Sequence, residues 1–155
     1  MLGTYPSEYR RYHVGMRVVL GSDDKTELTD AILKGLHGRG FEVEVVGPPA
    51  GEDKDWVAVG REVGERVAKG EADSGVLLCW TGTGASIAAN KVTGVRAALC
   101  TDRETAQGAR RWNDANVLVM SLRLTSPTVA DEMLDVWFRT DPDPEEQTTI
   151  AALEP

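Results

Sequence analysis

Short apolar runs alternate with stretches of helical periodicity along most of this chain. The apolar runs are typical of buried strands and cover residues 16–20, 41–46, 75–79, 95–100 and 116–120. Between and after them, helical spacing and capping residues predict helices over 26–38, 56–68, 83–91, 102–111 and 127–140. Because strand and helix alternate, we expect an α/β fold with a five-stranded, parallel, doubly wound sheet, a Rossmann-like α/β/α sandwich of strand order 2-1-3-4-5.

The character of single runs refines this picture. Glutamate alternates with apolar residues over 41–46, which indicates an edge strand, whereas 75–79 is apolar throughout and indicates a central one. A chain of 155 residues suits one domain. We therefore predict an N-terminal arm over 1–15, an α/β domain over 16–140 and an acidic C-terminal tail over 141–155.

Composition excludes several classes of partner. The net charge is -8, from 17 basic and 25 acidic residues, which argues against binding nucleic acid or an anionic membrane surface. No apolar run approaches the roughly 20 residues that span a bilayer, and residues 1–15 lack the apolar core of a signal peptide, so we expect a cytoplasmic protein. The two cysteines, Cys79 and Cys100, are expected to be free thiols, and neither they nor the two histidines have metal-ligand spacing. We predict neither a metal nor another cofactor.

The stretch from Val76 to Lys91 carries the candidate chemistry. An apolar strand ends at Cys79, a Thr/Gly turn follows, and a helix of small residues begins. Ligands of parallel α/β sheets bind where strand ends meet helix N-termini, because free N–H groups point outward there. Cys79 is therefore a candidate nucleophile or base. Asp23 and Asp24 end the first strand and are candidates for the same crevice.

Four segments carry a family resemblance. They are Gly21-Ser22-Asp23, the run Cys79-Trp80-Thr81-Gly82-Thr83-Gly84-Ala85-Ser86-Ile87-Ala88-Ala89-Asn90-Lys91, Gly94-Val95-Arg96-Ala97, and Asn113-Asp114-Ala115-Asn116-Val117-Leu118. In this order the chain resembles the ribose-5-phosphate isomerase type B family, which also contains the galactose-6-phosphate isomerase subunits. The resemblance covers residues 16–138.

The resemblance implies a metal-free aldose–ketose isomerisation through a cis-enediol, in a homodimer or tetramer whose sites lie at a subunit interface. By position, Cys79 matches the family's base and Thr81 a hydroxyl that relays protons among the sugar oxygens. The backbone N–H groups of 82–85 would stabilise the enediolate oxygen. The substrate-binding residues implied or inferred are Asp23, Asp24, Gly82, Thr83, Gly84, Ala85, Ser86, Trp112, Asn113 and Arg123.

Several positions depart from the family pattern. Asp24 stands where the family has a histidine, Trp112 replaces the histidine that opens the sugar ring, and Trp80 replaces a glycine. The family's C-terminal phosphate-binding arginines have no match after residue 138, so Arg123 alone remains as a match for that role. The substrate is then a different sugar phosphate, a shorter one already in open-chain form, or a sugar without phosphate.

The alternative to an enzyme is a non-catalytic sugar- or sugar-phosphate-binding subunit of the same fold. Simple structural roles also stand beside the functional ones. Cys79 could be a small buried residue, the two aspartates a turn and a helix cap, and Trp80 and Trp112 core or interface anchors. Cys100, Trp56 and Trp137 are expected to serve packing only.

Overall fold

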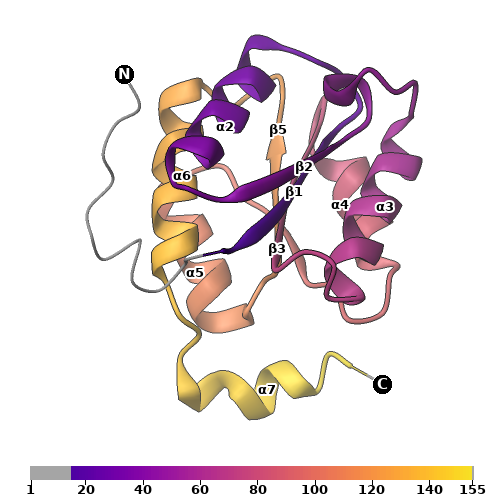
Figure 1. Ribbon diagram of the computed structural model, residues 1–155. Coiled ribbons are helices and arrows are strands. Elements are labelled where there is room, and N and C mark those ends of the chain that lie inside the picture. The colour runs from indigo at the N-terminus through magenta and orange to yellow at the C-terminus, as the bar shows by residue number, and fades with distance from the viewer. Residues whose placement is uncertain (1–14, 155) are drawn as a thin grey trace.

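The computed structural model describes residues 15–154, in which one parallel sheet is covered by helices on both faces (Figure 1). The predicted arm over 1–15 lies outside the described residues except for Gly15. The strands are β1 (Arg17–Ser22), β2 (Glu42–Val46), β3 (Ser74–Cys79), β4 (Ala97–Leu99) and β5 (Val117–Ser121). The helices are α2 (Glu27–Gly38), η1 (Pro48–Ala50), α3 (Trp56–Ala68), α4 (Thr83–Asn90), α5 (Arg103–Asn113), α6 (Pro127–Arg139), η2 (Pro144–Glu146) and α7 (Gln147–Ala151).

The predicted fold class is confirmed, and the predicted order of the last two strands is wrong. The sheet has the order β2-β1-β3-β5-β4, with every pair parallel, instead of 2-1-3-4-5. All five residues of β5 are buried, whereas the three residues of β4 are half-buried. A strand covered on both faces belongs at the centre, so β5 lies between β3 and the short edge strand β4. The other edge is β2, as its alternating glutamates predicted.

Each face of the sheet has its own apolar core. Side chains of α2, α5 and α6 pack with Val18, Val76 and Leu118 on one face. Side chains of α3 and α4 pack with Val19, Leu77 and Val119 on the other. Consecutive residues of each strand therefore serve opposite faces, and Figure 1 shows the two helical layers on either side of the strands.

Capping residues begin the helices where the sequence predicted them. The Asp102 and Ser126 side chains accept hydrogen bonds from the N–H groups of Thr105 and Val129, and Pro127 occupies the first turn of α6. The cap of α2 is Thr26, in a reciprocal capping box with Thr29, and not an aspartate of the preceding turn. Asp23 and Asp24 are thus left without a capping role.

The acidic tail is folded against the domain. Ile150 of α7 is buried, and ion pairs join Arg111 to Asp143 at 3.2 Å and Arg96 to Glu154 at 3.5 Å. The division into arm, domain and tail stays a prediction.

Candidate active site

The carboxyl ends of β1, β3 and β5 lie side by side and bring most of the predicted residues together. Ser22 of β1 is in register with Leu78 of β3, and Cys79 is in register with Ser121 of β5. Asp23 directly follows Ser22, as Cys79 directly follows Leu78. Parallel strands present the same end to one edge of a sheet, so this edge is the candidate site.

The thiol of Cys79 lies at the base of a constrained turn. Cys79 is 5% exposed, and the chain turns three residues later at Gly82, whose φ is 81°. A Cβ on Gly82 would lie 2.5 Å from Leu99 Cδ1 and 3.1 Å from the Met120 carbonyl oxygen. Only glycine fits both this left-handed backbone and this space. The turn therefore has one conformation beside the thiol.

The N-terminus of α4 presents unused N–H groups at this turn. The first hydrogen bond of the helix runs from the Ser86 N–H to the Gly82 carbonyl oxygen, at 3.1 Å. The N–H groups of residues 82–85 precede it and have no acceptor within the helix. The hydroxyls of Thr81 and Thr83 lie 2.7 Å apart and share a hydrogen bond. Free N–H groups and the helix dipole both favour a negative ligand atom here.

Carboxylates gather on the β1 side of the site. Burial raises the pKa of Asp23 above its usual value, and the neighbouring carboxylates of Asp24 and Asp55 add smaller effects of the same sign. A hydrogen bond from its own backbone N–H partly offsets the effect of burial. Asp24 is exposed and accepts a hydrogen bond from the Lys25 N–H at 2.8 Å. This side suits donors such as sugar hydroxyls better than it suits a phosphate.

The β5 side of the site carries a cation. The Arg123 N–H donates to the Trp80 carbonyl oxygen at 3.1 Å, and the Ser121 hydroxyl donates to the same oxygen at 2.9 Å. These two bonds hold the turn after β5 against Trp80, the residue that follows Cys79. Trp80 is 64% exposed and Arg123 is exposed, so an indole and a guanidinium face the solvent at this edge.

Two predicted residues, Trp112 and Asn113, lie at the opposite edge of the sheet. They end α5, which runs back from the carboxyl end of β4 to the amino end of β5. The two edges lie at opposite ends of β3, which is roughly 16 Å long at a rise of about 3.3 Å per residue. Asn113 lines a cavity of about 570 Å³ with Arg96 and Leu153. One chain therefore does not bring Asn113 to Cys79.

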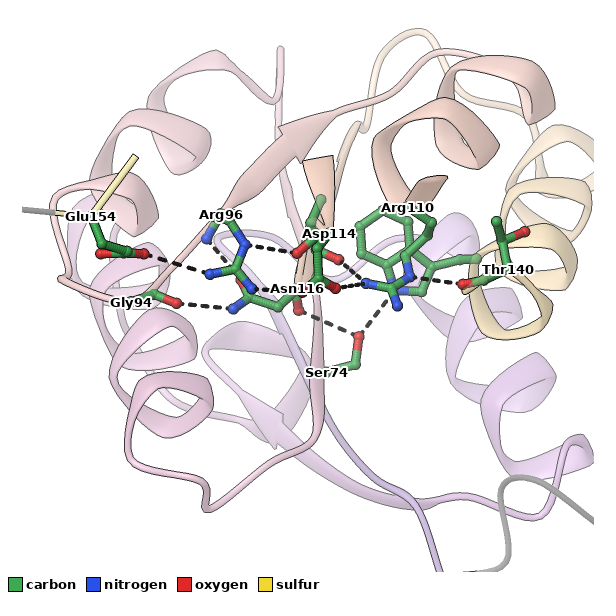
Figure 2. Close-up of polar contacts among 10 residues, drawn as sticks. Ser74, Gly94, Arg96, Arg110, Asp114, Asn116, Thr140 and Glu154 are labelled. Carbon is green, nitrogen blue, oxygen red and sulfur yellow. Dashed lines mark hydrogen bonds and ion pairs between the residues drawn. The ribbon is translucent and has the colours of Figure 1, made fainter. Parts of the chain in front are cut away.

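Polar groups at this amino edge bond mainly to one another (Figure 2). The Arg96 Nε donates to the Asp114 carbonyl oxygen at 2.8 Å, and Arg110 Nη1 donates to the Asp114 carboxylate at 3.0 Å. The Asn116 side chain accepts from the Arg96 N–H at 2.8 Å and donates to the Gly94 carbonyl oxygen at 3.0 Å. This network ties the start of β5 to the segment before β4 and to the end of α5.

Sequence reasoning missed the N-terminus of α3. Asp55 caps this helix by accepting from the Ala58 N–H at 2.8 Å, and its charge acts on Asp23. Trp56 is 44% exposed and its ring lies against Gly84 of the turn. The sequence did contain a signal for these residues. The helix that follows the edge strand β2 begins at the carboxyl edge of the sheet, so its first residues, Asp55 and Trp56, were candidates for the site.

The second cysteine has a different environment. Cys100 is buried in the core on the α2, α5 and α6 face, and both cysteines are free thiols, as predicted. Burial, with a smaller effect of Asp102, raises the pKa of the Cys100 thiol to about 12. This thiol stays protonated and has a packing role.

Over residues 15–154, no three His, Cys, Asp or Glu side chains are grouped so that they could hold a metal ion. In the same range, none of the helices combines the length and apolar character needed to cross a membrane. The absence of a metal or cofactor from the reaction stays a prediction.

Known proteins are similar to this chain in both sequence and fold. The profile of the family described as Ribose/Galactose Isomerase matches residues 18–152. Ribose-5-phosphate isomerase B of Escherichia coli is 40% identical over 111 residues, which are 72% of this chain and 74% of that protein. The D-erythrulose-4-phosphate isomerase of Pectobacterium atrosepticum is 34% identical over 125 residues, 79% of this chain and 82% of that protein.

A solved structure agrees with these matches. Ribose-5-phosphate isomerase B of Mycoplasma genitalium, solved with bound ribulose-5-phosphate, has a TM-score of 0.84 and 30% identity, and the match covers 91% of this chain and 95% of that chain. The range matched by the family profile includes nearly all of the sheet and the candidate site. The chain belongs to the ribose/galactose isomerase family, whose members named above are sugar-phosphate isomerases.

Proposed function

We propose that this protein is an aldose–ketose isomerase that acts on a sugar phosphate through a cis-enediol, with Cys79 as the base and without a metal. The observation that carries the proposal is a thiol at the end of β3 beside N–H groups that lack an acceptor within α4. A base next to an anion-stabilising turn is what proton transfer beside a carbonyl requires. Membership of the isomerase family supports the same reaction class.

The reaction begins with proton abstraction. The Cys79 thiolate takes the proton from the carbon next to the aldose carbonyl, and the electron pair of that C–H bond forms the C=C bond of the enediolate. The former carbonyl oxygen becomes an oxyanion that the N–H groups of 82–85 stabilise, and a well-placed donor commonly contributes about 3 to 4 kcal/mol. The Thr81 hydroxyl moves a proton between the two oxygens. Cys79 returns its proton to the former carbonyl carbon, which gives the ketose.

We propose a short, open-chain sugar phosphate as the preferred substrate. Opening a cyclic sugar needs an acid–base group, and His37, the one histidine within residues 15–154, lies in the last turn of α2 at the amino edge. A tetrose that carries phosphate on its terminal oxygen has no free hydroxyl to close a furanose ring. The relative from Pectobacterium atrosepticum is named for such a substrate. Arg123 is a cation of this edge that would bind the phosphate, and Asp23 and Asp24 would accept hydrogen bonds from sugar hydroxyls.

We also propose that the active unit is a homodimer, or a tetramer built from such dimers, with sites at the subunit interface. Asn113 cannot reach Cys79 of its own chain, so Asn113 and Trp112 of a second copy would complete each site. A two-fold dimer supplies both sites with the same residues from the partner.

The test is an isomerase assay on D-erythrose 4-phosphate, D-erythrulose 4-phosphate, D-ribose 5-phosphate and free D-ribose. We expect the tetrose phosphates to have the largest kcat/KM. In D₂O, deuterium should enter the carbon next to the carbonyl with the wild type and not with Cys79→Ala. Binding without conversion or exchange would indicate the non-catalytic subunit instead.

Mixing subunits tests the shared site. Cys79→Ala and Asn113→Ala are each expected to be inactive as homodimers. After mixed refolding, heterodimers carry one site with both wild-type residues and should regain about a quarter of the wild-type activity, because half of the dimers are mixed and each has one intact site. No recovery would contradict an interfacial site.

A further inference from the structure

The N-terminal turn of α4 is held from two sides. On the sheet side, Leu99 and Met120 leave no room for a side chain on Gly82. On the other side, Trp56 of α3 covers Gly84. A Cβ on Gly84 would lie 2.7 Å from Trp56 Cε3 and 3.0 Å from its Cδ2 and Cζ3. Real Cβ atoms do not approach this closely, so the indole is in direct contact with the backbone of the turn.

The two helices also meet one turn further along. A Cβ on Gly60 would lie 2.9 Å from both the Ala85 carbonyl oxygen and the Ala88 Cβ. This close approach fixes α3 against the body of α4. Trp56 extends the contact to Gly84, whose N–H is one of the donors without an acceptor within α4.

Trp56 does not belong to the buried stripe of its own helix. That stripe consists of Val59, Val63 and Val67, which pack on the sheet, whereas Trp56 is 44% exposed. The start of the helix is fixed because Asp55 accepts the Ala58 N–H at 2.8 Å. The ring is thus anchored at a helix start, with part of its surface on Gly84 and part facing solvent.

We propose that Trp56 is a positioning residue for the isomerisation: its indole holds Gly84 so that the N–H groups of the turn point at the enediolate oxygen. This inference rests on the proposed function of the same site. Donors of an oxyanion hole contribute to catalysis only when their orientation is fixed before the reaction. Gly84 lies in the first turn of α4 and glycine has a wide range of backbone conformations, so loss of the indole removes a contact that restricts the direction of its N–H.

Steady-state kinetics of Trp56→Ala and Trp56→Phe on the preferred sugar phosphate test the proposal. We expect Trp56→Ala to lower kcat about 10- to 100-fold, a fraction of the loss seen when a whole donor is removed, with KM changed less than about threefold. Trp56→Phe should regain most of kcat, because a smaller ring still covers Gly84. A hydroxamate analogue of the enediolate should lose affinity by the same factor as kcat/KM. Leu33→Ala, a half-buried apolar residue of α2 on the opposite face of the sheet, is the matched control.

A double mutant separates positioning from general damage. Gly84→Ala places a methyl against the indole, so it should cost less kcat when Trp56 is already alanine. Where Trp56→Ala fails to fold in a melting experiment, Trp56→Leu replaces it. An unchanged kcat in the alanine variant, or equal losses in the alanine and phenylalanine variants, would overturn the inference. Wild-type protein without any isomerase activity would instead overturn the proposed function.

Discussion

The two edges of the sheet use their polar groups in opposite ways. At the amino edge, Asn116, Asp114 and two arginines satisfy one another and the nearby backbone (Figure 2). At the carboxyl edge, N–H groups of α4 lack an acceptor within the helix beside the Cys79 thiol. Satisfied groups hold the fold together, and unsatisfied groups are available to a ligand. Within one chain, the amino edge therefore serves stability and the carboxyl edge carries the proposed chemistry, and only Trp112 and Asn113 would connect the amino edge to the site of a second copy.

The two cysteines give the sharpest test of this division. Cys79→Ala should lower kcat by about 10³-fold, within the range for loss of a general base. Cys100→Ala should keep the wild-type kcat and lose about 1 kcal/mol of unfolding free energy, because its thiol is buried in the core and donates only to the Ala98 carbonyl oxygen, at 3.5 Å. Assays and thermal melts of both variants check this. Equal loss of activity in both would remove the distinction between the two thiols.

Gly82→Ala should damage the carboxyl edge through the backbone. The new methyl meets Leu99 and strains a residue with a φ of 81°, so the turn must move away from Cys79. We expect a loss of about 10² in kcat and about 1 to 3 kcal/mol in unfolding free energy. The kcat and the midpoint of chemical denaturation measure the two effects. Wild-type values of both would show that the turn is not constrained.

Asn116→Ala should affect stability alone. It removes the acceptor for the Arg96 N–H and the donor to the Gly94 carbonyl oxygen at the amino edge. We expect a loss of about 1 to 3 kcal/mol in unfolding free energy, with kcat per folded molecule unchanged. Denaturant titration beside the standard assay tests this. A drop in kcat at full folding would show that the network around Asn116 also positions Asn113 for the site of a second copy.

Two aspartates should give small pH effects of opposite sign. Between its ordinary pKa and its raised one, folded Asp23 binds more protons than the unfolded chain, so its contribution to stability falls as the pH rises through this window. Burial opposes ionisation of Asp73, but hydrogen bonds from Arg17 outweigh it and lower the pKa, so this contribution is lost as the pH falls.

At pH 7 we therefore expect Asp23→Asn to be more stable than wild type and Asp73→Asn to be less stable. Each effect should stay below about 1 kcal/mol, because solvent screens both groups. Melting temperatures measured from pH 3 to pH 8 should show both differences shrinking below about pH 4. The same sign for both variants would contradict the contrast between the edges.

The sequence predicts the secondary structure of each segment better than it predicts the contacts between segments. Apolar runs and capping residues identify β3, α5 and α6, since these signals are local. The order of β4 and β5 depends on relative burial, which the half-buried Ala97–Leu99 shows only in the folded sheet.

The candidate site follows the same rule. Cys79 and its glycine turn lie together in the sequence and were found there. Trp56 meets Gly84 from another helix, and Asn113 is separated from Cys79 by the direction of α5, so both placements depend on tertiary packing.

The return of α5 to the amino edge has a consequence for measurement. If Asn113 of a second copy completes each active site, a folded single chain lacks one residue of the site and is inactive. Specific activity would then fall on dilution below the dissociation constant of the dimer, while the circular dichroism of each chain stayed the same. Inhibitors that separate the subunits would act without entering the site.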